Sequence, residues 1–290
     1  MMTGIWSACG RVGIVVAVLV ALAGQALCAD AGKVGVVDHR LVSQDFLIKP
    51  WATEWQSVKI AEQFNRNGVE AEVIGADVLQ NLAELKAYHA IMIPTDQCYP
   101  DLGSSKGAVS ANIRAFVKAG GVYIMPMVAG HSHWKDIKTG KLSEDMGLQK
   151  DFLGLEWVTV ADPNITGPGL IVTEGGQKCG LELPSFAEPF STCTRTVNPI
   201  GLVYLMNGSG KESLYMCPVG KGAILHYAGG LPFSATVRNY VITCYSRVLQ
   251  KGLDEASLSS LAVAQVAKKR VFTMMPVAER STNRQFNLNG

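Results

Sequence analysis

Four short, strongly apolar runs recur along the chain and do most to limit how it can fold. They are "KVGVVDH" (33–39), "HAIMIPTD" (89–96), "VYIMPMV" (122–128) and "KGAILHYAGG" (221–230). Apolar residues at consecutive positions predict strands that are buried on both faces. Segments with apolar residues at helical spacing lie between them at 54–70, 79–88 and 110–121, and another follows the last run at 234–252. Strands alternating with amphipathic helices predict an α/β protein whose sheet is mostly parallel and covered on both sides.

The pattern changes in two later parts of the chain. From about 150 to 218, short alternating runs such as "LEWVTVAD" and "GLIVTEGG" are separated by Gly and Pro, which predicts a β-rich extension. Residues 254–290 begin with helical spacing to about Lys269 and then have too little apolar content to pack. We therefore expect one α/β domain over 30–253, followed by a helical and then flexible tail.

The first 29 residues read as a secretory signal peptide. Arg11 is the only charged residue before Asp30, and the apolar run that follows it is succeeded by small residues around Cys28. A retained anchor is the alternative, but the run is shorter than the ~20 residues that a bilayer requires. Lipidation at Cys28 is a second alternative, but Leu27 just before it is a poor match to the small residue that lipoprotein signals have at that position. We expect a secreted or periplasmic protein with no stable membrane span after cleavage.

Charge and cysteine content narrow the classes of partner. The 290 residues carry a net charge of +2, and Lys and Arg are scattered along the chain, which argues against a nucleic-acid partner. Five cysteines follow the signal segment: Cys98, Cys179, Cys193, Cys217 and Cys244. Cys179 and Cys193 could close a short loop in an oxidising compartment, or the cysteines could be buried and unpaired. Spacing alone does not decide between the two.

Four segments in order resemble a known superfamily. They are "AIMIPTDQCYPD" (90–101), "IRAFVKAGGVYIMP" (113–126), "ADPNITGPG" (161–169) and "GKGAILHYAGGLP" (220–232). Together they resemble the class I glutamine amidotransferase-like superfamily, in particular the trehalose-utilisation-type proteins and the trimerisation domain of β-galactosidases. The resemblance covers about 30–252. It implies a flavodoxin-like three-layer α/β sandwich with a mostly parallel sheet, to which the β-rich extension is added.

The same resemblance argues against amidotransferase chemistry. Its implied nucleophile position, within "MPMVAGH" (125–131), is occupied by Val128, which has no nucleophilic atom. His226 resembles the superfamily's catalytic histidine but lacks the Pro-Glu that should follow it. We therefore expect the fold with a degenerate active site.

Polar residues gather after the apolar runs, where ligands of doubly wound sheets bind. The expected ligand-binding residues are Asp38, His39, Asp96, Tyr99 and His131. The alternative for Asp38 and Asp96 is that they cap the helices or turns that follow, because unpaired backbone N–H groups favour a carboxylate.

The segment "HSHWKD" (131–136) suggests a metal site. Imidazoles two residues apart on an extended segment point the same way, and a carboxylate could complete a three-ligand divalent metal site. The candidate metal ligands are His131, His133 and Asp136, with Asp38 or Asp96 as other carboxylates. The candidate catalytic residues are Asp96, His131 and His133. Solvated or capping histidines are the alternative, and no cofactor is then expected.

These observations favour an exported binding or assembly module that is not an amidotransferase. A connection with carbohydrates rests on the resemblance alone, and the expected ligand is a small molecule or a sugar. The alternative is a metal-dependent hydrolase that uses His131, His133 and an Asp to activate water. A homo-oligomer without a ligand is a third alternative, which would present an apolar surface patch.

Overall fold

The computed structural model describes eleven stretches of the chain. These are 32–42, 55–94, 98–126, 133–145, 153, 157–159, 170–185, 194–196, 200–207, 210–228 and 234–251. The expected signal peptide and the expected tail lie outside these residues. Within them, no helix combines the length and the apolar character that a membrane crossing requires.

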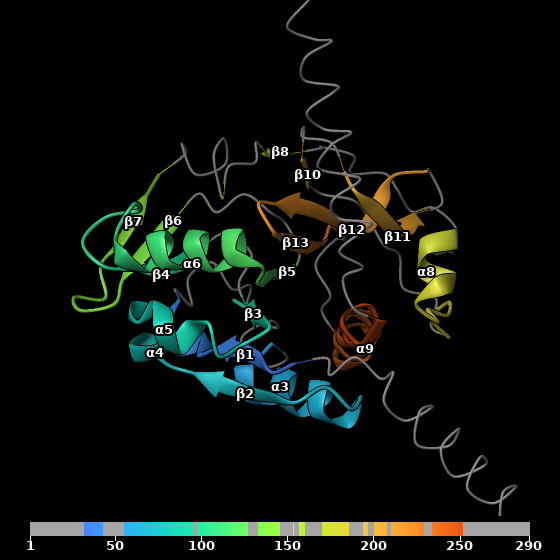
Figure 1. Ribbon diagram of the computed structural model, residues 1–290, viewed down its shortest axis with the longest axis horizontal. Coiled ribbons are helices and arrows are strands. Elements are labelled where there is room, and N and C mark those ends of the chain that lie inside the picture. The colour runs from blue at the N-terminus through green and yellow to red at the C-terminus, as the bar shows by residue number, and fades with distance from the viewer. Residues whose placement is uncertain are drawn as a thin grey trace, which may run out of the picture.

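Five neighbouring parallel strands form one side of an eight-stranded sheet, beginning at its edge (Figure 1). They are β1 (Val34–Val37), β2 (Ala71–Ile74), β3 (Ala90–Met92), β5 (Val122–Pro126) and β13 (Gly222–Tyr227). Their spatial order is β2-β1-β3-β5-β13. Counted along the chain, this is second, first, third, fourth, fifth, which is the strand order of the flavodoxin-like fold.

The remaining strands of this sheet are antiparallel. β12 (Glu212–Val219) pairs with β13, β11 (Leu202–Asn207) pairs with β12, and β9 (Leu170–Val172) pairs with β11. β8 (Trp157–Thr159) and β10 (Thr194–Thr196) form a separate antiparallel pair. The predicted fold class, a flavodoxin-like sandwich with a mostly parallel sheet and a β-rich extension, is confirmed.

A small second sheet is built from the segments that follow β3 and β5. It contains β4 (Cys98–Asp101), β6 (His133–Asp136) and β7 (Leu142–Glu144). β4 and β6 are parallel, while β6 and β7 are antiparallel. Both β4 and β6 begin a few residues after a central strand ends, so the small sheet lies on the side of the carboxyl ends of the parallel strands.

Two helices cover one face of the central sheet. α3 (Ser57–Arg66) contributes Ile60 and Phe64, and α9 (Ala235–Lys251) contributes Val241 and Tyr245 to a core that includes alternate residues of the parallel strands. The apolar side chains of α3 recur at helical spacing, so a single stripe of this helix meets the sheet. This explains why a helix with a strongly polar outer face forms here.

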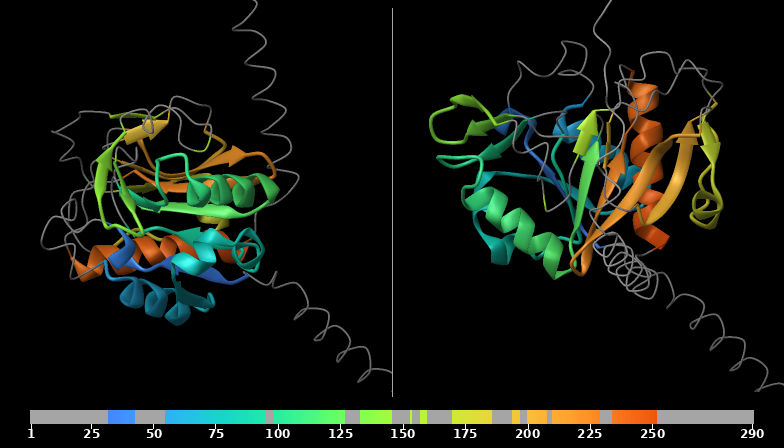
Figure 2. Two further views of the ribbon diagram at one scale, coloured as in Figure 1. Left: turned by 90° about the vertical axis from the view of Figure 1, so that its left-hand side faces the viewer. Right: turned by 90° about the horizontal axis from the view of Figure 1, so that it is seen from above.

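The helices on the other face are α4 (Ala76–Gln80), α5 (Leu82–Leu85) and α6 (Ala108–Ala119). They pack through residues such as Leu79, Leu85 and Ile113 against strand residues that include Ile91 and Ile224. In both views of Figure 2 the green helix α6 and the orange helix α9 lie on opposite sides of the strands. Another short helix, α8 (Glu174–Lys178), packs beside β9 and β11.

The N-terminus of α6 is held by a buried carboxylate. Asp101, at the end of β4, is fully buried and accepts hydrogen bonds from the backbone N–H groups of Leu102 (2.7 Å), Gly107 (3.1 Å) and Val109 (3.1 Å). A carboxylate there also interacts favourably with the helix dipole. Gly107 is needed at this cap, because a Cβ atom would lie 2.5 Å from Asp101 Oδ1.

One predicted helix is divided. The sequence predicts a single helix over 79–88, but the chain forms α4 and α5 with Asn81 between them. Asn81 has an extended backbone, and its side-chain oxygen accepts a hydrogen bond from Ala83 N at 3.1 Å. This cap competes with helix continuation, as Asn side chains commonly do.

The packing of α3 predicts different responses at two of its apolar residues. Phe64 is fully buried, whereas Val58 is 55% exposed on the same helix. Phe64→Ala should lower the free energy of unfolding by about 3–5 kcal/mol, because it removes a large buried ring and leaves a cavity. The control Val58→Ala should change it by less than about 0.5 kcal/mol. Urea unfolding of both variants measures this, and equal losses would contradict the packing described.

Candidate functional site

The carboxyl ends of β1 and β3 form a topological switch point. β1 is followed along the chain by α3, which covers one face of the sheet, whereas β3 is followed by α6 on the other face. The two connections therefore leave the sheet in opposite directions, and ligands of open α/β sheets bind in the crevice between such connections. Among the described residues, Asp38 and His39 lie at this point.

Asp38 both caps a turn and forms an ion pair. A short 3-10 helix, η1 (His39–Leu41), follows β1, and the Asp38 carboxylate accepts a hydrogen bond from Arg40 N at 2.9 Å. It also accepts from Arg40 Nε at 2.9 Å and pairs with Nη2 of the same guanidinium. Arg40 holds the pKa of the Asp38 carboxyl below its usual value. Asp38 therefore caps the turn that follows it, as the alternative in the sequence analysis expected. Its carboxylate is ionised at neutral pH.

His39 is tied to the first turn of α3. Its backbone N–H donates to Ser57 Oγ at 2.6 Å, and its Nδ1 lies 3.1 Å from the same oxygen. The Ser57 hydroxyl in turn donates to the carbonyl oxygen of Val37 at 2.8 Å. Burial lowers the pKa of His39, and the neighbouring Asp38 carboxylate opposes that shift. These contacts fix the η1 turn against the start of α3.

Asp38, His39 and Ser57 do not form a nucleophilic triad. In such a triad the serine and the carboxylate contact different ring nitrogens of the histidine. Here Ser57 Oγ and Asp38 Oδ1 both approach His39 Nδ1, at 3.1 Å and 3.6 Å. Ser57 is also fully buried, and its hydroxyl hydrogen bonds to a backbone carbonyl. The arrangement can hold a loop in place and present polar groups, but it does not activate the serine.

The small sheet reaches the same turn through Lys135 of β6. Its Nζ donates hydrogen bonds to the carbonyl oxygens of Arg40 and Val42, both at 3.2 Å. The lysine thus supplies hydrogen bonds to two backbone carbonyl groups at the end of η1. As a result, two segments that are about a third of the chain apart form one edge of the candidate site.

The structure gives Asp136, an expected metal ligand beside His133, a different set of contacts. Within β6, alternate side chains point to opposite faces, so residues three apart in the strand do not face the same way. Asp136 instead accepts hydrogen bonds from the backbone N–H groups of Gly103 (2.9 Å), Lys138 (2.9 Å) and Thr139 (2.7 Å). These bonds lower the pKa of its carboxyl. Among the described residues no group of three His, Cys, Asp or Glu could hold a metal ion.

Tyr99, an expected ligand-binding residue, lies in the core. Its side chain is fully buried, and its hydroxyl donates to the carbonyl oxygen of Ser105. Burial and the nearby Asp101 raise the pKa of the hydroxyl well above its usual value. The neighbouring Cys98 is fully buried too. Cys179, Cys217 and Cys244 are free thiols, and Cys193, the other residue of the expected loop, lies outside the described residues.

Several expected site residues fall outside the described part of the chain. These are Asp96, His131 and the degenerate nucleophile position Val128. His133, which is half-buried on β6, pairs across the small sheet with Cys98 and Glu144. The roles of Asp96, His131 and His133 therefore stay predictions.

Near the same edge, His226 has a buried polar partner that was missed from the sequence. His226 of β13 and Tyr215 of β12 are directly opposite in the antiparallel ladder. Both are fully buried; His226 Nδ1 lies 2.7 Å from the Tyr215 hydroxyl oxygen, and the ring centroids are 5.0 Å apart in an edge-to-face arrangement. A polar residue within the apolar run 221–230 was the available signal. Its partner could not be found without the strand register.

Comparisons with known proteins add weak similarities. The sequence matches no protein-family model and none of the curated proteins. Among solved structures, it is similar to a β-galactosidase from Bacillus circulans, with 12% identity over 83% of this chain and 31% of that one, at a TM-score of 0.41. A ThuA-like protein from Bacteroides uniformis has 11% identity over 75% of this chain and 91% of that one, at a TM-score of 0.40.

A cytoplasmic protein from Salmonella typhimurium has 13% identity over 74% of this chain and 98% of that one, at a TM-score of 0.38. The chain spans about a third of the β-galactosidases to which it is similar. The assignment to the flavodoxin-like class of α/β proteins rests on the strand order of the sheet itself.

The environment of His39 predicts a pH effect on stability. Because its pKa is lowered on folding from 6.5, the unfolded chain binds a proton at His39 more readily than the folded chain does. Lowering the pH from about 7.5 to about 5.5 should therefore reduce the free energy of unfolding, and His39→Asn should remove this part of the loss. Urea unfolding at both pH values measures the difference. Equal losses in the two proteins would contradict the burial of a neutral imidazole.

Proposed function

We propose that this protein is an exported binding module for a small polar ligand, which it holds at the carboxyl ends of β1 and β3. The observation that carries the proposal is the switch point between these two strands, with Asp38 and His39 beside it. At this position a ligand lies between two connections that leave the sheet in opposite directions. The turn that borders it is fixed by Ser57 on one side and by Lys135 on the other.

The burial of four nucleophilic side chains among the described residues favours reversible binding over covalent chemistry. Ser57 is buried and hydrogen bonded to Val37, and Cys98, Cys217 and Cys244 are buried. Burial raises the pKa of the Cys217 and Cys244 thiols, which lowers their thiolate fraction at neutral pH. The sequence adds a valine at the implied nucleophile position. These features support a module that binds its ligand without attacking it.

A sugar is the proposed class of ligand. This part of the proposal rests on the ordered segments that resemble trehalose-utilisation-type proteins and β-galactosidase trimerisation domains. Export is proposed from the charge and apolar pattern of residues 1–29. Small-molecule sites orient their ligand with a few fixed polar groups, and the ionised, partly exposed Asp38 is such a group here.

An assembly role without a ligand is less well supported by the described surface. The large apolar side chains that are exposed there are Val58, Val73, Ile171 and Leu183. They belong to α3, β2, β9 and the segment after α8, so no described element presents more than one of them. Assembly surfaces gather such residues into a contiguous patch.

The binding proposal predicts an effect of charge at one edge of the sheet only. Saturation-transfer NMR with a panel of mono- and disaccharides on the mature chain should find a ligand, and Asp38→Asn should weaken it about tenfold, the effect of losing one charged hydrogen bond. The control Glu70→Gln removes the same charge just before β2, at the edge of the sheet opposite to Asp38. It should leave the affinity for the saccharide unchanged. Absence of saccharide binding, or equal weakening in the two variants, would overturn the proposal.

The hydrolase alternative gives a separate result. If the protein is a binding module, elemental analysis of the mature protein purified without added metal should find no stoichiometric divalent metal. The same should hold for the double variant His131→Ala with His133→Ala. A stoichiometric metal in the wild-type protein that disappears in the double variant would replace the binding proposal by a metal-dependent hydrolase.

A further inference from the structure

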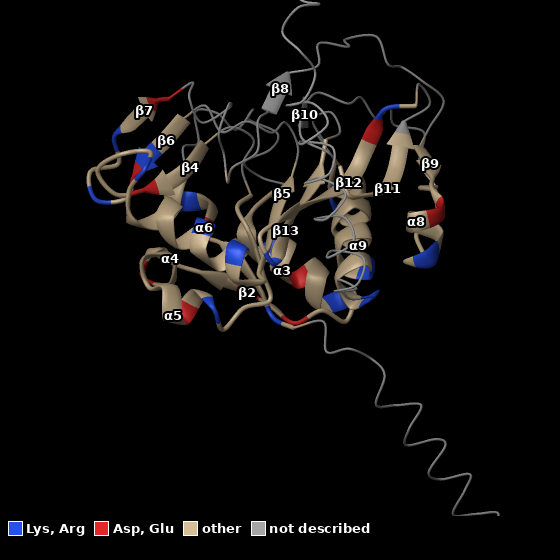
Figure 3. Ribbon diagram, turned by 45° about the horizontal axis from the view of Figure 1, so that its top comes forward, with Lys and Arg blue, Asp and Glu red and all other residues tan. Residues whose placement is uncertain are grey.

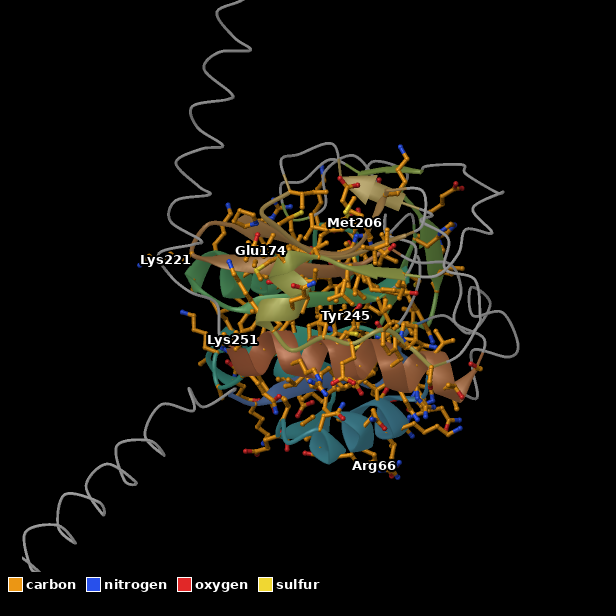
Figure 4. All side chains as sticks on the ribbon, turned by 90° about the vertical axis from the view of Figure 1, so that its right-hand side faces the viewer. Arg66, Glu174, Met206, Lys221, Tyr245 and Lys251 are labelled. Atoms are coloured by element: carbon orange, nitrogen blue, oxygen red, sulfur yellow. The ribbon has the colours of Figure 1, made fainter. Side chains whose placement is uncertain are left out.

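A cavity of about 460 Å³ opens at the opposite edge of the sheet from the proposed sugar site. It lies where α3 and α9 end and where α8 gives way to Cys179. α3 ends just before β2 begins, so this is the edge of the amino ends of the parallel strands. The volume falls within the range of small-molecule sites. Figure 4 shows α9 along its length and labels Lys251 at the end of α9 and Arg66 on α3.

The cavity is lined by basic residues. Arg66, Arg247 and Lys251 contribute to its wall, and none of its described lining residues is acidic. The C-termini of α3 and α9 together supply about one negative charge through the helix dipoles, which leaves roughly two positive charges unbalanced. Glu62 lies 3.9 Å from Arg66 but on the exposed outer side of α3, where such a pair is weak. The positive charge of the lining side chains therefore exceeds the negative charge that the two helix C-termini supply.

The walls of the cavity are held by a polar network. Asn67 donates to Thr243 Oγ1 at 3.1 Å and to Ser246 Oγ at 3.3 Å, which joins the end of α3 to α9. Gln250 donates to the Asn67 carbonyl oxygen at 2.7 Å, and Arg247 donates through one nitrogen to the Gly180 carbonyl oxygen. Arg247 is thus anchored by one of its five donors. A guanidinium held in this way loses little freedom when it binds an anion.

The partly exposed thiol in the cavity does not offset the charge. Burial raises the pKa of Cys179 above its usual value, although Lys251 opposes the shift. The thiol is therefore protonated at neutral pH and adds no negative charge.

We propose that this cavity binds a small dianion, the phosphate group of a soluble phosphate monoester, between Arg247 and Lys251. A second cavity of about 340 Å³ shares Thr243 and Arg247 with the first. Leu181, Pro184 and Tyr240 line it, and Glu182 places a negative charge there. The anionic group belongs in the first cavity, and the second accepts the uncharged body of the ester beside the Tyr240 ring.

The test is calorimetric titration of the full mature chain with inorganic phosphate at constant ionic strength. Phosphate should bind saturably and should raise the temperature of unfolding. Lys251→Gln and Arg247→Gln should each raise the Kd about tenfold, since each removes one charge-assisted contact. Acetate, a monoanion, should bind more weakly than phosphate. Lys251 is exposed at the end of α9, so its variant tests the site even if Arg247→Gln unfolds the protein.

The matched control is Lys118→Gln. Lys118 is an exposed cation in the last turn of α6, on the other face of the sheet, so the change in net charge is the same. Its Kd for phosphate should equal that of the wild-type protein. An equal rise in Kd for the control and the cavity variants would show diffuse attraction and would overturn the proposal. So would the absence of saturable binding at about 1 mM phosphate.

Discussion

The burial of the central strands on both faces is the constraint on which the rest of the structure depends. Every residue of β3, β5 and β13 is buried, and neither β5 nor β13 carries a charged residue (Figure 3). Such strands cannot remain in contact with water on either side, so helices must cover both faces. The chain meets this requirement by sending α3 and α9 to one face and α4, α5 and α6 to the other. The change of face between the connections after β1 and β3 creates the switch point that defines the proposed site.

Much of the central sheet could be predicted because its signal is local. The four apolar runs mark four of the five parallel strands, and a helical stripe such as Ile60, Ala61 and Phe64 marks the helices that cover them. The small sheet could not be predicted in the same way, because β4 and β6 pair across more than thirty residues in a register that the sequence does not display. The division at Asn81 depends on one side-chain cap, which competes with a helical pattern that otherwise continues.

At the site, the sequence placed polar residues correctly after the strands but could not choose their partners. Asp38 follows β1 as predicted, yet its carboxylate is engaged by Arg40 two residues later. Asp136 satisfies three backbone N–H groups of nearby turns, a role open to any carboxylate near unpaired donors. Tyr99 follows the second apolar run (89–96), but β4 turns it into the core. Partner choice depends on backbone positions fixed by the whole fold, and so it was accessible only from the structure.

The bond from Lys135 to the turn after β1 links two parts of the molecule that have no strand pairing in common. The ammonium group holds two carbonyl oxygens of the turn, and the backbone of the same lysine belongs to the ladder between β4 and β7. A ligand that displaces the turn must therefore either break these bonds or carry the small sheet with it. The turn after β1 and the strands β4, β6 and β7 would then respond to one binding event as a single unit.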